Sequence, residues 1–238
     1  MIQIAIILIL SFQCFGQAQV IELGTQSNWR PYQYTENSNV RGIAIEALDC
    51  IFTQMNIPYN VTVYPWARAQ HLTKTGRVDG FFSASKNKKR DSYAKLSTLF
   101  LPQKRSFYIY KNNIRIPISN IDLAFIKTKH TSARVGSNAL HFLHKNNYKV
   151  VPPTKESEHS YFQMQRGRVF AYLENDLVFQ EFLNQSKTYK ESDFIKVPAM
   201  EKNLGVYFSN KFLMKNRQFL EEFNKYASRC SLIDNSRD

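Results

Sequence analysis

The segment with the clearest chemistry is residues 79–97, which read DGFFSASKNKKRDSYAKLS. Arg90 ends a basic cluster in this segment, and its guanidinium can bind a carboxylate through two parallel hydrogen bonds, which a lysine cannot do. Ser83 and Ser85 lie two residues apart, so their hydroxyls could donate to the same anion. We therefore predict that these three side chains hold one carboxylate. The alternative is that Arg90 is a surface base like the lysines within 86–89, which we expect to face solvent.

A second set of anion-binding donors is expected at residues 136–138, which read Gly-Ser-Asn. This turn opens a predicted helix, where unpaired backbone N–H groups suit an anion. Ser137 or Asn138 could instead be the N-cap of that helix. The two roles are compatible.

Aromatic side chains are candidates for a wall that packs against the ligand. Trp29 and Tyr32 follow the first predicted strand, Trp66 precedes a predicted helix, and Phe82 lies within a strand. Aromatic faces also attract cationic groups. Trp29 is the best candidate because it lies in a loop, whereas core packing is the simpler interpretation of Phe82 and Trp66.

The elements that must position these side chains alternate along the first ninety residues. Strand patterns near 20–23, 59–66 and 78–85 are separated by helical patterns in 42–56 and 67–76. This order predicts a parallel sheet covered by helices. Ligands bind such sheets at the carboxyl ends of the strands, which is where Trp29 and residues 83–90 fall.

The same alternation returns between residues 133 and 176, and aromatic strands at 105–112 and 203–209 join the two halves. We therefore predict an α/β fold of two lobes, with hinge bending near Arg105–Tyr110 and Leu204–Phe208. The first lobe is expected to comprise residues 19–106 and 207–238, and the second residues 107–206. A cleft between two lobes is a favoured site for a small ligand.

Residues 1–18 have the pattern of a signal peptide. Ile2–Leu10 is apolar and too short to cross a bilayer, and small residues follow at Gly16 and Ala18. A buried N-terminal strand is the alternative. Export to the periplasm would leave Cys50 and Cys230, which exported proteins often pair. Two free buried thiols are the other possibility for these cysteines.

The formal charge of +13 favours anionic partners. Lysines and arginines are spread along the whole chain, and no nucleic-acid-binding signature accompanies them, so we expect a solvated surface and no nucleic-acid partner. His141 and His144 are three residues apart on a helix but have no third ligand at suitable spacing. We predict no metal site, no cofactor and no nucleophilic catalytic set.

Three local patterns resemble the bacterial solute-binding proteins of family 3, the periplasmic amino-acid-binding components of ABC importers. The first is NWRPYQYTENSNVRGIAIEAL at 28–48, with an aromatic-Pro-aromatic segment, a glycine and an acidic residue. The second is GRVDGFFSASKNKKRDSYAKLS at 76–97, with a Gly-x-x-Asp strand, a Ser-x-Ser turn and an arginine five residues later. The third is QRGRVFAYLEND at 165–176. The resemblance covers about residues 20–230.

The resemblance implies that Arg90 clamps the α-carboxylate of an amino acid and that the turn at Ser137 and Asn138 faces this carboxylate from the other lobe. It also implies that Glu174 receives the ammonium group, where the alternative is a surface carboxylate near Asp176. The family usually has Asp at the position of Glu174, and a hydrophobic-Thr-x-x-Arg sequence after the second serine, where this chain has Lys-Asn-Lys-Lys-Arg at 86–90. These departures leave the ligand open.

The resemblance therefore implies a monomeric, non-enzymatic periplasmic protein that captures a small amino acid or related carboxylate for a membrane permease. Two other functions fit the same fold. One is a sensory module that presents its closed lobes to a receptor. The other is a periplasmic lyase or dehydratase, for which Glu174 is the candidate acid or base.

Overall fold

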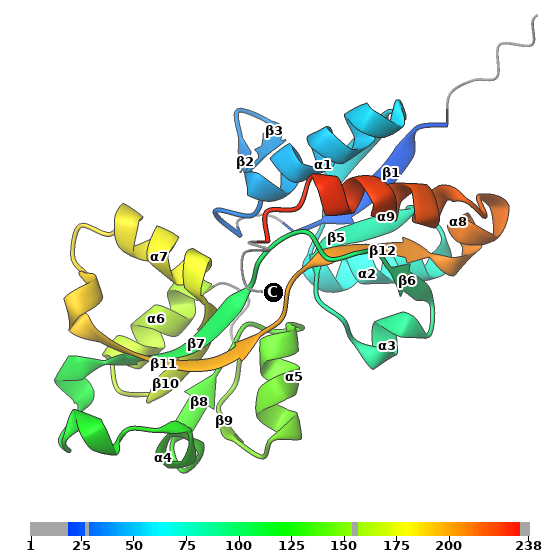
Figure 1. The fold of residues 1–238 in the computed structure, drawn as a ribbon. Coiled ribbons are helices and arrows are strands. Elements are labelled where there is room, and N and C mark those ends of the chain that lie inside the picture. The colour runs from blue at the N-terminus through cyan, green and yellow to red at the C-terminus, as the bar shows by residue number, and fades with distance from the viewer. Residues whose placement is uncertain (1–18, 27–28, 154–156, 234–238) are drawn as a thin grey trace, which may run out of the picture.

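The computed structural model describes residues 19–26, 29–153 and 157–233. The predicted signal peptide, residues 1–18, lies outside this part of the chain. Figure 1 shows two lobes, each built around a five-stranded sheet with helices packed on it. The predicted two-lobed α/β fold is confirmed. Within the described ranges, no helix has both the length and the apolar character needed to cross a membrane.

The first lobe has the strand order β4-β1-β5-β12-β6. The strands β1, β4 and β5 run parallel, as the alternation of strand and helix predicts. The strands of this sheet are β1 (Ile21–Thr25), β4 (Tyr59–Val63), β5 (Gly80–Ala84), β6 (Ala94–Leu96) and β12 (Gly205–Ser209). The helices of this lobe are α1 (Ile43–Met55), α2 (Trp66–Thr75), α3 (Lys88–Asp91), α8 (Asn210–Lys215) and α9 (Phe219–Arg229).

A short hairpin of β2 (Tyr34–Glu36) and β3 (Asn39–Arg41) interrupts the connection from β1 to α1. Its turn residues Asn37 and Ser38 have φ values of 48° and 65°, which suit a tight hairpin. Gly42, which follows, has φ 120°. A Cβ atom at this position would lie only 2.5 Å from the carbonyl oxygen of Tyr32. A glycine is therefore required where the loop that contains Trp29 meets helix α1.

The second lobe has the strand order β11-β7-β10-β8-β9. Its strands are β7 (Lys104–Tyr110), β8 (His130–Ser132), β9 (Lys149–Val150), β10 (Ala171–Asn175) and β11 (Phe194–Glu201). Its helices are α4 (Leu123–Lys127), α5 (Asn138–Lys145), α6 (Ser157–Gln165) and α7 (Asp176–Gln185), with short 3-10 turns at Lys111–Asn113, Ile118–Asn120 and Glu191–Asp193. The strand β11 contains Pro198, which an edge strand tolerates.

The chain crosses between the lobes twice, and the two crossing segments pair with each other. The backbone N–H of Leu204 donates to the carbonyl of Leu101 at 2.8 Å, and that of Lys202 donates to the carbonyl of Gln103 at 2.9 Å. The predicted hinge residues 105–110 lie within β7 of the second sheet, and residues 205–208 lie within β12 of the first. The crossover itself is therefore at residues 101–103 and 202–204, just outside these strands.

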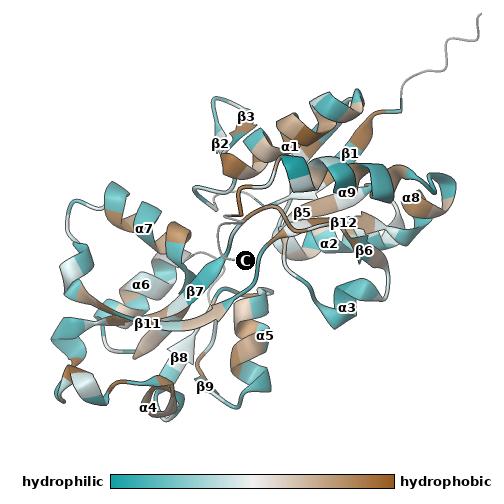
Figure 2. Cartoon of the chain, in the orientation of Figure 1, coloured by the Kyte–Doolittle hydropathy of each residue, from teal (hydrophilic) through white to brown (hydrophobic). Residues whose placement is uncertain are grey.

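The core of the first lobe lies beneath α1 and α9, which pack side by side (Figure 1). A disulfide joins Cys50 on α1 to Cys230 at the end of α9, with the two Cα atoms 6.0 Å apart. Figure 2 shows apolar residues concentrated in strands such as β5 and β12 and polar residues on exposed helices such as α3. All five residues of β5 and of β12 are buried.

The C-terminal helical pattern is divided in the structure. Residues 211–230 have apolar side chains at helical spacing, but α8 ends at Lys215 and α9 begins at Phe219. The side-chain amide of Asn216 donates to the carbonyl of Phe212 at 3.1 Å, so asparagine binds the backbone at the end of α8. The break allows Phe212 and Phe219 to meet edge to face, with ring centroids 4.8 Å apart.

Candidate functional site

A small cavity of about 20 Å³ lies between the two lobes. It is at the carboxyl ends of β1, β5 and β8, where parallel sheets form ligand crevices. The first lobe and its crossover contribute Gln26, Trp29, Trp66, Ser83, Ser85, Arg90 and Leu204 to the lining. The second lobe contributes Arg105, Arg134, Ser137 and Asn138. Five of the predicted ligand residues besides Arg90 are thus brought together here.

Arg90 is buried, with 4% of its surface exposed. Its Nε donates to Oε1 of Gln70 at 3.0 Å, and its Nη1 donates to the carbonyl of Ser85 at 3.1 Å. These bonds use two of the five N–H donors of a guanidinium. Its partners in the described part of the chain are neutral, and burial lowers its pKa. The interpretation of Arg90 as a solvated surface base is therefore wrong, whereas Lys86, Lys88 and Lys89 are exposed as predicted.

The surroundings of Arg90 are suited to hold the guanidinium in one orientation. Its carbon Cζ lies 5.2 Å from the ring centre of Trp66 and 5.7 Å from that of Phe81. Aromatic faces attract guanidinium groups and fix their plane. Asn87 is the N-cap of α3, and its side chain accepts from the backbone N–H of Lys89 at 2.9 Å. This N-cap turns the chain so that Arg90 points inward while the lysines point out.

Ser83 lies in an unusual backbone conformation on the cavity wall. Its φ is 57°, a left-handed value that costs a non-glycine residue about 1–2 kcal/mol. Its hydroxyl donates to Oε1 of Gln33 at 2.7 Å, and both side chains are buried. Strained backbone tends to occur at binding sites, and here it lies within β5, whose pairing with β12 has an irregular register.

Two substitutions at Ser83 separate the strain from the hydrogen bond. We expect Ser83→Ala to lower the free energy of unfolding by about 1–3 kcal/mol, because it leaves the buried Gln33 oxygen without a donor. Ser83→Gly loses the same bond but adopts the positive φ readily, so its loss should be about 1 kcal/mol smaller. Urea unfolding of the two variants measures the difference. Equal losses would show that the position is not strained.

Direct hydrogen bonds across the cavity join the two lobes. The side-chain amide of Asn138 donates to Oγ of Ser85 at 2.5 Å and to its carbonyl at 3.3 Å. The amide of Asn87 donates to Oδ1 of Asn138 at 2.6 Å. Ser137 is the N-cap of α5 and accepts from the backbone N–H of Leu140 at 3.1 Å. Ser137 therefore has the capping role and lines the cavity as well.

Trp29 is 3% exposed and lines the cavity, with its ring stacked on Tyr32 at a centroid distance of 4.5 Å. Tyr32 lies behind it and does not line the cavity. The Tyr32 hydroxyl donates to the carbonyl of Pro102 at 2.5 Å and accepts from the amide of Asn175 at 3.0 Å. Burial raises the pKa of Tyr32 to about 12. Tyr32 thus supports Trp29 and links the first lobe to the crossover and the second lobe.

Glu174 is buried on β10, with 6% of its surface exposed. The interpretation of Glu174 as a surface carboxylate is therefore wrong. Its Oε1 accepts from the backbone N–H of Asn175 at 2.8 Å, and its Oε2 accepts from the hydroxyl of Tyr172 at 3.2 Å. It does not line the cavity, but it raises the pKa of Arg105 electrostatically. In this arrangement Glu174 faces a protein cation.

Several cavity residues were not identified from the sequence. The sequence predicts Arg105 only as part of a hinge strand and gives no prediction for Arg134, and Trp66 is a candidate for which core packing is the simpler interpretation. Trp66 lines the cavity because it begins α2 directly after the loop from β4. Gln26 and Leu204 complete the group. The only local signal was that Gln26 follows the first strand, at the sheet edge where ligands bind.

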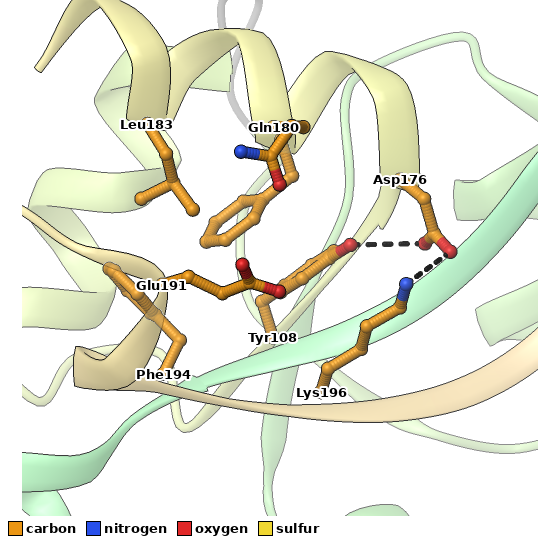
Figure 3. A pocket seen from close by; sticks show the side chains of 8 residues that line it. Tyr108, Asp176, Gln180, Leu183, Glu191, Phe194 and Lys196 are labelled. Carbon is orange, nitrogen blue, oxygen red and sulfur yellow. Dashed lines mark hydrogen bonds and ion pairs between the residues drawn. The ribbon is translucent and has the colours of Figure 1, made fainter.

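A larger cavity of about 100 Å³ lies within the second lobe, between β7, β11 and α7. Figure 3 shows Glu191 extending toward its centre and an ionic group at its edge. In that group, Nζ of Lys196 lies 2.7 Å from Asp176, which also accepts from the hydroxyl of Tyr108 at 3.0 Å. These polar groups satisfy each other, and one lobe alone forms the cavity. The cavity between the lobes is therefore the better candidate.

Comparisons with known proteins support the architecture. The arginine-bound form of a truncated ArgBP from T. maritima matches with a TM-score of 0.71 at 13% identity, covering 88% of this chain and 95% of that one. ArtJ from Geobacillus stearothermophilus, which binds arginine, lysine and histidine, matches with a TM-score of 0.72 at 11% identity, covering 89% of each chain. A histidine kinase sensor domain similar to periplasmic binding proteins matches with a TM-score of 0.75 at 13% identity, covering 89% of each chain.

At these identities the structural matches establish the fold and not the ligand. A search of curated proteins gave no match. In the described part of the chain, no three histidine, cysteine or acidic side chains form a group that could hold a metal ion. The family model for bacterial extracellular solute-binding proteins, family 3, matches residues 21–230. That range includes both lobes and the cavity between them, and the chain belongs to this family.

Proposed function

We propose that this protein is exported and binds a small carboxylate solute, an amino acid or a related molecule, between its two lobes. The observation that carries the proposal is Arg90, a buried guanidinium at the cavity whose described hydrogen-bond partners are neutral. Burying a cation is unfavourable unless an anion or several acceptors compensate. A ligand carboxylate would supply that anion and use the donors that Gln70 and Ser85 leave free.

Binding requires the lobes to separate and close again. The cavity of about 20 Å³ has room for about one water molecule, so the ligand must enter an open form. Opening would break the bonds of Asn138 to Ser85 and Asn87 and would bend the chain at residues 101–103 and 202–204. A ligand that contacts both lobes would favour the closed form. We propose the lobe boundaries at these two crossings.

The positive charge of the cavity lining affects which amino acid can bind. Two of the matched structures bind arginine, but the cavity of this chain is lined by Arg90, Arg105 and Arg134. Like charges in a poorly solvated site repel strongly. A cationic side chain is therefore disfavoured here, and the solute we propose is neutral or acidic apart from its zwitterionic groups.

Capture for a membrane permease is the role we propose, with the protein located in the periplasm after removal of residues 1–18. Sensing is a second candidate, because a histidine kinase sensor domain has the same fold. Binding without turnover fits both roles. Glu174, the candidate acid or base, raises the pKa of Arg105 electrostatically and does not line the cavity. This position does not favour a lyase.

A thermal-shift screen tests the proposal. Purified protein is heated with each of the common amino acids, with small dicarboxylates and with polyamines. At a hundredfold excess over the dissociation constant, a ligand stabilises the folded state by about 2.7 kcal/mol. For a chain of this size, we expect a rise in melting temperature of about 5–10 °C. Recovery of the bound compound unchanged, by mass spectrometry, distinguishes binding from catalysis.

The polyamines are the control of opposite charge and should give no shift. If no carboxylate compound moves the melting temperature, the proposed function is refuted while the fold is unaffected. A compound that binds and is recovered as a different product would instead identify an enzyme.

A further inference from the structure

Three guanidinium groups line the cavity between the lobes, although one is enough to bind one carboxylate. Arg90 comes from the first lobe, Arg105 from β7, and Arg134 from the loop between β8 and α5. The cavity is small, so these cationic groups are close together. The two additional arginines are not part of the pattern that predicted Arg90, and they have no role in the carboxylate clamp described above.

Arg105 is buried, with 6% of its surface exposed against 4% for Arg90. Its one hydrogen bond to a side chain in the described part of the chain joins Nη1 to the sulfur of Met200 at 3.9 Å, which is a weak acceptor. The pKa of Arg105 is lowered to about 10, chiefly by burial and in part by the charges of Arg134 and Arg90, while the charge of Glu174 opposes the shift. Arg105 therefore remains charged at neutral pH and has most of its donors available.

Arg134 is half-buried and lies on the opposite wall from Arg90. Its Cζ is 5.2 Å from the ring centre of Trp29, so an aromatic face orients it toward the cavity. Within the described residues, no carboxylate oxygen lies within 4.0 Å of its side-chain nitrogens. Arg134 therefore faces the cavity as a cation that no carboxylate of the described residues pairs with.

The formal charges around the cavity do not balance. The three guanidiniums carry +3 and Glu174, which faces Arg105, carries −1, so the sum is +2. The exposed carboxylate of Asp91 raises the pKa of Arg90 electrostatically, and it accepts a hydrogen bond from the hydroxyl of Tyr207 at 2.6 Å. The excess positive charge also acts on Lys202. Its pKa is lowered mainly by partial burial and in addition by cations that include Arg105 and Arg90.

We propose that the cleft binds a solute with two acidic groups. This inference rests on the proposed function and narrows it. Arg90, with the hydroxyl of Ser85, holds one acidic group, and Arg105 and Arg134 hold the other from the second lobe. A dicarboxylate of four or five carbons, with or without an amino group, has the chemistry that this charge distribution requires. Because the two acidic groups bind different lobes, such a solute would also hold the lobes together.

Calorimetric titration with matched pairs tests the proposal. The probes are L-glutamate against L-glutamine and L-aspartate against L-asparagine, with succinate as the acid without an amino group. Each pair differs in one charge and hardly in shape. A hydrogen bond to a charged group contributes about 1.5–3 kcal/mol, so we expect at least one acid to bind about tenfold or more tightly than its amide. Tight binding of succinate also supports the proposal.

Substitutions of single arginines then test which side chains bind the second acidic group of the solute. Arg134→Gln is expected to bring the ratio of acid to amide affinity close to one, because it removes one of the two cations that face that group. Arg166→Gln makes the same change of charge at an exposed position of the same lobe and should keep the ratio. Arg105→Lys retains the charge but loses the paired N–H donors of the guanidinium. It should lower the ratio of acid to amide affinity less than Arg134→Gln does. Using the ratio makes the result independent of changes in overall affinity.

The outcomes distinguish this inference from the function on which it rests. If none of these acids and amides binds but another amino acid raises the melting temperature in the screen, the inference is overturned and the proposed function stands. If an amide binds as tightly as its acid, the cleft is a binding site but the second acidic group is excluded. If Arg166→Gln lowers the ratio as much as Arg134→Gln, the preference comes from general surface charge, and the assignment to Arg105 and Arg134 is overturned.

Discussion

Arg90→Lys should weaken binding of the best ligand of the thermal-shift screen by about 10- to 100-fold. The charge is kept, but a lysine cannot make the two parallel bonds that a guanidinium makes to a carboxylate. Losing one hydrogen bond between charged groups corresponds to about 1.5–3 kcal/mol. Arg90 also holds Gln70 and the carbonyl of Ser85, so the melting temperature of the unliganded variant is measured first. Calorimetric titration then gives the affinity.

Arg68→Lys is the matched control, since Arg68 is exposed on the neighbouring helix α2 and does not line the cavity. Its affinity should equal that of the unmodified protein. A folded Arg90→Lys variant with unchanged affinity would remove Arg90 from the binding site, and with it the central argument for carboxylate recognition.

Replacing Cys50 and Cys230 together by alanine is expected to lower the free energy of unfolding by about 2–4 kcal/mol. The disulfide spans 180 residues of sequence, and cross-links that close long loops restrict the unfolded chain most. For a chain of this length, the melting temperature should fall by about 5–15 °C. Scanning calorimetry in the absence of reductant measures the change.

Reduction of the unmodified protein provides the internal comparison. Added thiol reductant should lower its melting temperature to about that of the double alanine variant and should leave the variant itself unchanged. If reductant has no effect on the unmodified protein at its melting temperature, the two cysteines do not stabilise it as a pair.

The fold could be predicted from the sequence because its signals are local. The apolar strand at Ile21–Thr25, the helical spacing in Ile43–Met55 and the glycine that ends α2 each indicate one element and its boundary. The strands β7 and β12, which lie next to the two crossings, are recognisable as aromatic stretches. The division between α8 and α9 was not predicted, because the apolar spacing continues through Asn216 and only the side-chain bond to Phe212 shows the break.

The candidate site was only partly predictable for the same reason. Ser83, Ser85 and Arg90 lie on one continuous segment, so their spacing alone indicates a shared role. Arg105 and Arg134 come from separate elements of the other lobe, and nothing next to them in the sequence distinguishes them from the many exposed basic residues. Their role depends on how the lobes meet, which the sequence pattern does not describe.

The positions of Tyr32 and Glu174 illustrate a second limit. Tyr32 follows β1, Glu174 lies near the carboxyl end of β10, and both are predicted ligand contacts. In the structure Tyr32 supports Trp29 from behind, and Glu174 lies next to Arg105. A sequence can place a residue near a strand end, but whether its side chain reaches the cavity depends on the neighbours that occupy the space in front of it.

The bond between Cys50 and Cys230 makes a covalent ring that contains the whole second lobe, since β7 begins at Lys104 and β11 ends at Glu201. A protease that cuts one surface loop of that lobe would produce two fragments that still migrate as one species until they are reduced. In a molecule cut in this way, the disulfide would still join α1 to the end of α9 in the first lobe. In an environment rich in proteases, a single cleavage would therefore not release either fragment.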